Sequence, residues 1–161
     1  MTYLPTGCDR PNLDDLDAFW ARARSAVPDL PDHYQVRWIG LDRDTTRQVI
    51  DLIRSGDKTG TFTLPWIVEN TGQPEPAVGD DIILIDFDGQ PQLVVRLTDI
   101  ETVPFGAIDE THTAIDGTPV RDLSIWKPLH TNYWNGMLAP FKRQVDDDMP
   151  VWIEKFELLY G

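Results

Sequence analysis

The sequence predicts an α+β fold, built as a small mixed sheet or partly open β-barrel with peripheral helices and an N-terminal amphipathic helix. Three observations support this class. Apolar residues recur at helical spacing near the N-terminus, and residues 151–160 are rich in aromatic and β-branched side chains. Between them, an apolar run and an alternating apolar run meet at the hairpin dipeptide Asp88-Gly89. Because strands follow one another through a hairpin instead of alternating with helices, a doubly wound parallel sheet is disfavoured.

The first expected element is an amphipathic helix, with Asn12 as its N-cap and with Pro28 and Pro31 closing it. Its apolar stripe consists of Leu13, Leu16, Phe19, Trp20, Ala23 and Val27. We predict that residues 1–35 form a helical extension packed on a domain of residues 36–161. A homodimer contact through this helix is an alternative use of the same apolar face.

A short strand and a second helix are expected next. Residues 34–38 alternate between apolar and polar side chains and end before Gly40, which predicts the strand. Asp44 is the expected cap of the following helix, and Gly56 stands where a left-handed residue commonly ends a helix. The buried stripe of this helix would be Val49, Ile50 and Ile53.

The central part of the chain is expected to form a hairpin. The turn residues 78–81 precede a strand over 82–87, and the returning strand begins near Pro91. A proline cannot donate to a strand ladder, so we expect this returning strand at a sheet edge. A separate short strand is predicted over 100–103.

Two helical segments are predicted before the closing strand. The first covers about residues 105–116 and ends at Gly117, and the second covers about residues 123–134. Asp122 is the expected N-cap of the second segment, and Pro128 should kink it.

Composition narrows the range of functions. The chain has 161 residues and 41% hydrophobic residues, as expected of one globular domain. Its net charge of -13 opposes binding along extended DNA or RNA, although residues 37–58 carry five basic against four acidic residues. The longest uncharged apolar run, 82–85, is too short to cross a membrane. The N-terminus lacks a signal-peptide pattern and Cys8 is the single cysteine, so a cytoplasmic location is expected.

The best candidate for chemistry is the segment 56–61, Gly-Asp-Lys-Thr-Gly-Thr. It places the amine of Lys58 and the hydroxyl of Thr61 near one another in what we expect to be a surface loop after a helix. A phosphate-binding P-loop is excluded, because Asp57 separates glycine from lysine and the helix precedes the loop.

Other motifs give no competing site. The three histidines lack paired metal-ligand spacing, the acidic run 146–148 lacks the features of a calcium loop, and no Gly-x-Ser-x-Gly sequence occurs. We therefore predict no metal and no cofactor. Trp66 is expected in a loop, where it would either stack on a planar ligand or pack in the core.

Gly56, Lys58 and Thr61 match the loop pattern Gly-x-Lys-x-x-Thr-x-Arg, and on this basis residues 36–160 resemble the ASCH domain, a PUA-like β-barrel family. Three positions depart from the pattern: Thr63 replaces the arginine, Asp116 stands where a glutamate is expected, and Asp122 stands where many long members have serine. Further features in the family's order are Val78-Gly79-Asp80, Asp88-Gly89, Pro104-Phe105, Leu123, Trp126, His130 and the closing strand.

The resemblance implies a cleft for a nucleoside or short single-stranded RNA. Some small members with a similar lysine loop are amidohydrolases of N4-acetylcytidine, others have been assigned ribonuclease activity, and the family was first proposed to bind RNA in regulation. Carried over by position, the catalytic candidates are Lys58, Thr61 and Asp116. The ligand-binding candidates are Gly56, Gly60, Arg54 and Trp66.

The residue chemistry is compatible with amide hydrolysis. A threonine hydroxyl becomes nucleophilic when a base takes its proton, and a neutral Lys58 is one such base, with Arg54 supplying a favourable field. Asp116 would steer the proton, and N–H groups around Gly60 would receive the oxyanion. The alternatives are RNA binding through Lys58, with Trp66 or Phe62 as a stacking surface, and a protein-interaction domain that uses the N-terminal helix.

Overall fold

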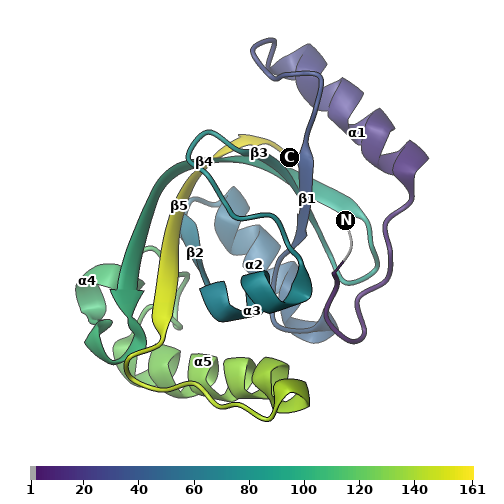
Figure 1. The fold of residues 1–161 in the computed structure, drawn as a ribbon. Helices are drawn as coiled ribbons and strands as arrows, with labels where there is room; N and C mark the ends of the chain where they lie inside the picture. The colour runs from purple at the N-terminus through teal and green to yellow at the C-terminus, as the bar shows by residue number, and fades with distance from the viewer. Residues whose placement is uncertain (1–2) are drawn as a thin grey trace.

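A computed structural model describes residues 3–161 as a five-stranded mixed sheet that curls into a half-barrel (Figure 1). The strand order is β1-β3-β4-β5-β2, with β1 parallel to β3 and all other pairs antiparallel. The predicted α+β class is confirmed. The strands are β1 (Gln35–Trp38), β2 (Gly60–Thr63), β3 (Asp81–Ile85), β4 (Pro91–Pro104) and β5 (Pro150–Tyr160).

The two long strands β4 and β5 form the spine of the half-barrel. Residues 100–103 belong to β4, so the prediction of a separate strand there is wrong. Two register shifts against β5 interrupt the alternation of β4, which explains why the sequence reads as two pieces. The predicted edge position of Pro91 is also wrong, because β4 pairs on both sides. Pro91 is tolerated as the first residue of its strand.

The hairpin strand β3 is buried on both faces, and this explains its unbroken apolar sequence. Ile82 and Leu84 face the interior of the half-barrel, where they pack with the buried side chains of α2 (Arg43–Arg54). Ile83 and Ile85 face the other side, where they pack with α1 (Leu13–Ala26).

The N-terminal helix α1 forms as predicted. Asn12 Oδ1 accepts hydrogen bonds from the backbone N–H groups of Asp14 and Asp15 at 2.8 and 3.2 Å. Most of the predicted stripe is buried against the sheet, and its buried members are Leu16, Phe19, Trp20 and Ala23.

Helix α2 begins two residues earlier than predicted. Asp42, and not Asp44, is its N-cap, with Asp42 Oδ1 accepting from Thr45 N at 2.9 Å. Asp44 lies in the first turn, where its charge favours the helix dipole. Gly56 follows the helix with φ 79°, as expected for a left-handed residue.

Sequence reasoning missed two short elements after the lysine segment, strand β2 and helix α3 (Pro65–Thr71). The four residues of β2 are too few to show a convincing period. Helix α3 lacks a side-chain cap at Leu64, although Pro65 is favoured at a first helical position. Trp66 therefore lies on a helix, and the prediction that it lies in a loop is wrong.

The predicted helix over 105–116 is broken into a 3-10 turn, Phe105–Ala107, and the short helix α4 (Glu110–Thr113). Helix α5 (Leu123–Leu138) begins at the predicted cap Asp122 and continues beyond the predicted end. It packs across the open side of the half-barrel near β2 and β5 (Figure 1). No helix in residues 3–161 combines the length and apolarity needed to span a membrane.

Candidate functional site

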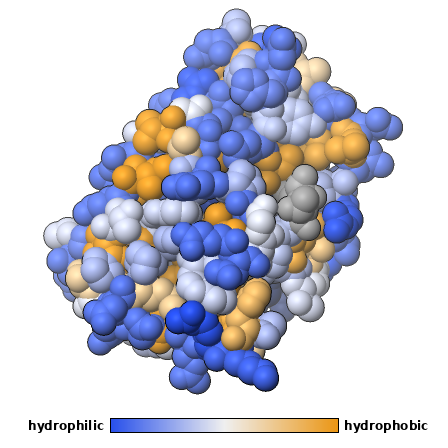
Figure 2. Space-filling view, viewed as in Figure 1, coloured by the Kyte–Doolittle hydropathy of each residue, from blue (hydrophilic) through white to orange (hydrophobic). Residues whose placement is uncertain are grey.

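A cavity of about 420 Å³ lies inside the half-barrel, a size typical of small-molecule sites. It is enclosed by residues of all five strands, of α2, α3 and α5, and of the segment after α4. Its walls are mainly apolar, while hydrophilic side chains cover most of the outer face shown in Figure 2. The site therefore consists of a few polar groups inside an apolar enclosure.

Lys58 enters this cavity from a tight turn at the end of α2. The N–H groups of Asp57 and Lys58 both donate to Leu52 O, at 2.9 and 3.0 Å, which folds the chain back over the helix terminus. Lys58 is only 7% exposed, so the prediction of a surface loop is wrong for this residue. Burial of a lysine requires a partner, and the partner determines its chemistry.

That partner is Asp116. Lys58 Nζ lies 2.8 Å from Asp116 Oδ1, and the same oxygen accepts from Gly117 N at 2.8 Å. Asp116 lines the cavity, and its Oδ2 accepts no hydrogen bond within residues 3–161. This oxygen is not fully buried. The structure thus joins two of the three predicted catalytic residues in a buried ion pair, with one carboxylate oxygen left free.

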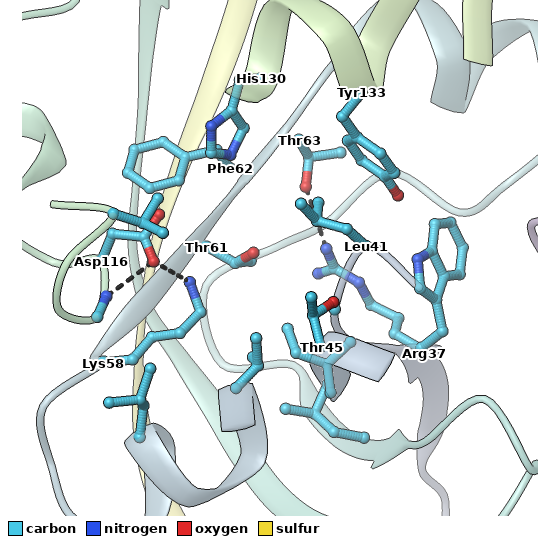
Figure 3. A pocket seen from close by; sticks show the side chains of 18 of the residues that line it. Arg37, Leu41, Thr45, Lys58, Thr61, Phe62, Thr63, Asp116, His130 and Tyr133 are labelled. Atoms are coloured by element: carbon cyan, nitrogen blue, oxygen red, sulfur yellow. Dashed lines mark hydrogen bonds and ion pairs between the residues drawn. The ribbon is translucent and has the colours of Figure 1, made fainter. Parts of the chain in front are cut away.

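Thr61, the third predicted catalytic residue, lines the same cavity from β2. In Figure 3 its side chain lies between the Lys58–Asp116 pair and Arg37. It stands opposite Glu154 in the β2–β5 ladder, so neighbouring strands fix its position. Its hydroxyl makes no hydrogen bond within residues 3–161.

The backbone around the lysine turn is largely occupied. The N–H groups of Asp57 and Lys58 bind Leu52 O, and Thr59 N donates to Ile115 O at 2.9 Å. These three groups cannot also bind an oxyanion. The ammonium group of Lys58 is then the group of this turn that can stabilise an oxyanion in the cavity.

A second ion pair, in the wall of the cavity, was missed by sequence reasoning. Arg37 on β1 binds Glu154 on β5 through two parallel hydrogen bonds, Nη1 to Oε1 at 2.8 Å and Nη2 to Oε2 at 3.0 Å. Thr63 donates to the same Oε2 and accepts from Arg37 Nη2 at 3.1 Å. A guanidinium therefore lies beside position 63 although that residue is threonine. No local pattern marked Glu154, because Lys155 follows it directly and Glu157 is a second acid in the same strand.

His130 on α5 also lines the cavity and was not predicted as a site residue. Its ring stacks on Trp126 at 4.0 Å between centroids, and its Nδ1 donates to Trp126 O at 2.9 Å. Burial lowers the pKa of His130 from 6.5 to about 4. The ring is therefore neutral at pH 7, with Nε2 as a hydrogen-bond acceptor.

The four predicted ligand-binding residues lie outside the cavity lining. Arg54 points away from Lys58, with Nη2 donating to Gln92 Oε1 at 3.2 Å and Nη1 3.6 Å from Asp51. Trp66 packs edge-on against Phe141, with their ring centroids 5.1 Å apart. Gly56 shapes the turn, and Gly60 allows close approach of the backbone of β5.

Comparison with known proteins identifies the fold family. A family model described as the ASCH domain matches residues 37–160. The chain belongs to the ASCH domain family. This confirms the predicted PUA-like, ASCH-type architecture and nearly reproduces the predicted span of residues 36–160.

Solved structures agree with this assignment. An ASCH domain from Lactobacillus crispatus JV V101 superposes with a TM-score of 0.82 at 19% identity, covering 100% of both chains. Protein EF3133 from Enterococcus faecalis V583 gives a TM-score of 0.80 at 23% identity, covering 91% of this chain and 89% of its own. The hypothetical protein PH0355 is more distant, with a TM-score of 0.52 at 18% identity over 78% of this chain and 99% of its own. The search of curated proteins found no match to this chain. At these identities the structures establish the fold alone.

Proposed function

We propose that this ASCH protein is an amidohydrolase that removes the acyl group from N-acylated nucleosides such as N4-acetylcytidine. The observation that carries the proposal is the buried ion pair between Lys58 and Asp116, which shares a cavity with the free hydroxyl of Thr61. Acyl transfer uses a nucleophile, a base and a group that stabilises the oxyanion. A hydroxyl, a carboxylate and an ammonium within one apolar enclosure can fill these three roles.

With this ion pair in view, we give Lys58 and Asp116 different roles from those of the sequence-based hypothesis. Lys58 in the pair is an ammonium without a free lone pair, so it stabilises the developing oxyanion instead of accepting a proton. Asp116 has a free Oδ2 and takes the proton of Thr61 as the hydroxyl oxygen bonds to the acyl carbon. The carbon–nitrogen bond then breaks, and the leaving amine receives the proton held by Asp116. Water hydrolyses the acyl-threonine, releasing the carboxylic acid and restoring the hydroxyl.

The charges in the cavity favour an uncharged ligand. Lys58 is matched by Asp116, and Arg37 is matched by Glu154, so these four groups carry no net charge. A phosphate placed among them would lose its hydration and gain no unpaired cation. This supports a nucleoside as ligand over an extended RNA, in keeping with the acidic surface of the chain.

The test is a turnover assay on N4-acetylcytidine and related N-acylated nucleosides, with an active family member as positive control for the substrates. We expect the native protein to release the free nucleoside. Lys58→Ala, Thr61→Val and Asp116→Asn should each lower kcat by about 100-fold or more. Lys155→Ala is the matched lysine control, because Lys155 is half exposed and lies outside the cavity. Absence of native turnover on competent substrates would refute the activity and leave RNA or ligand binding, or ribonuclease activity, at the same cavity.

A further inference from the structure

We propose that Arg37 is the ligand-orienting residue of the cavity and that it binds the ring carbonyl of a neutral pyrimidinone, a heterocycle of the cytosine type. This inference rests on the proposed function for the identity of the reacting amide, but its test needs no turnover. It starts from the Arg37–Glu154 pair, which the three catalytic candidates do not use.

The guanidinium is held in a fixed orientation. Glu154 is fully buried and accepts three hydrogen bonds, two from Arg37 and one from Thr63. Because the pairing is bidentate and comes from rigid strands, the guanidinium plane cannot rotate freely. Glu154 therefore acts as a positioning residue for Arg37.

Part of this fixed guanidinium remains available. Arg37 has five N–H groups, and its contacts to Glu154 and Thr63 engage three of them. Its Nε donates to no acceptor within residues 3–161. It is nevertheless not one of the fully buried, unpartnered side-chain atoms of that part of the chain. Arg37 lines the cavity, and we take its unengaged N–H groups as the donors that a ligand there would meet. Such a donor favours an acceptor on the ligand, and it penalises an analogue that lacks one.

The chemistry of the ligand follows from the two ends of the site. Thr61 lies between the Lys58–Asp116 pair and Arg37 in Figure 3, so an amide attacked at Thr61 extends its ring towards Arg37. The Arg37 charge is already matched by Glu154, which disfavours a phosphate or carboxylate there. A neutral carbonyl oxygen satisfies the donor without adding charge. In an N-acylated 4-amino-2-pyrimidinone, the ring carbonyl and the acylated amine lie on the same edge, with one ring nitrogen between the carbons that carry them.

The experiment is calorimetric binding of two ligands, cytosine and 4-aminopyrimidine, the second of which lacks the ring carbonyl and the neighbouring ring N–H. We expect the native protein to prefer cytosine by roughly 10-fold to 100-fold, the value of one hydrogen bond to a charged donor. Arg37→Lys keeps a cation for Glu154 but loses the planar donor set, so it should abolish the preference.

The matched control is Arg96→Lys. Arg96 also pairs bidentately with a carboxylate, through Nε and Nη2 to Asp81 at 2.7 and 3.2 Å. Its side chain is 25% exposed against 26% for Arg37. It lies outside the cavity, so this variant should keep the native preference. If Arg37→Lys fails to fold, the double variant Arg37→Met/Glu154→Gln removes both charges together and should also lose the preference.

Equal native affinity for the two ligands, binding of neither, or retention of the preference in the Arg37 variants would overturn the inference. The preference without hydrolysis of N4-acetylcytidine would support the inference and refute the proposed activity. Hydrolysis without the preference would support the proposed activity and refute the inference about Arg37.

Discussion

Lys58 Nζ lies 2.8 Å from Asp116 Oδ1, and both side chains are less than one tenth exposed although 58 positions separate them in the chain. The pair joins the turn after α2 to the segment after α4. Removing two charged groups from water is costly, and a pair is retained there only when each partner compensates the other. The site is thus a product of tertiary structure, and its two halves depend on one another.

A double-mutant cycle on this pair tests the dependence. Lys58→Met leaves the Asp116 carboxylate buried without its cation, and we expect it to lower the free energy of unfolding by about 3–5 kcal/mol. Adding Asp116→Asn removes the uncompensated charge and keeps an acceptor for Gly117 N, so the double variant should be more stable than Lys58→Met alone. Urea unfolding provides the measurement.

The control for this cycle is Lys155→Met. The Lys155 amine lies 3.8 Å from Asp99, and both side chains are more than half exposed, so the change should stay within about 0.5 kcal/mol. If the double variant is as unstable as the sum of the two single variants, the two groups do not compensate one another.

The sequence predicted the fold class because local signals were strong where packing is regular. The Asp88-Gly89 hairpin, the Asn12 cap and the closing strand all follow from short-range patterns. Two of the errors occurred at Pro91 and in residues 100–103, where the two-sided pairing and register shifts of β4 override local propensity.

The site was predicted in part for a related reason. Lys58 and Thr61 lie within one short segment and share a recognisable pattern, and Asp116 came from the family resemblance. Arg37 and Glu154 are 117 positions apart and meet only across the curled sheet. No single-sequence pattern pairs such residues, and within β5 the neighbouring Lys155 and Glu157 hide Glu154 among other charged residues.

Gly60 is expected to be intolerant of any side chain. A Cβ at this position would lie 2.5 Å from Glu154 O and even closer to Ile115 Cδ1, and the carbonyl belongs to the paired strand β5. Gly60→Ala should therefore separate β2 from β5 and lower the free energy of unfolding by about 1–3 kcal/mol. The matched control is Gly136→Ala within α5, where nothing lies within 4 Å of the added carbon. This change should raise stability by up to about 1 kcal/mol, and equal effects of the two substitutions would contradict the packing argument.

Burial of His130 should make stability depend on pH. Its pKa is lowered from 6.5 to about 4 in the folded protein, chiefly by burial. Between these two pH values the unfolded chain therefore binds a proton at this residue and the native state does not. Unfolding is then favoured as pH falls from about 7 towards 4, and this residue alone should cost roughly 2 kcal/mol between pH 7 and pH 5. His130→Gln should reduce that pH dependence, measured as the difference in unfolding free energy between the two pH values. His33→Gln, at an exposed position, should leave it unchanged, and an unaltered dependence in His130→Gln would refute the assignment.

The paired charges of the cavity predict that nucleoside affinity is nearly independent of salt. Counterion release requires cations that neutralise phosphates, whereas Lys58 and Arg37 are already matched by carboxylates within the protein. Calorimetric affinity for cytidine should therefore stay within about 2-fold between about 50 and about 500 mM salt, because no ion atmosphere is displaced. A short single-stranded oligonucleotide measured in parallel is the comparison, since each phosphate contact would give a slope of about -0.7 in log affinity against log salt. Tight oligonucleotide binding with a steep slope, together with weak nucleoside binding, would favour an RNA-binding module over a nucleoside amidohydrolase.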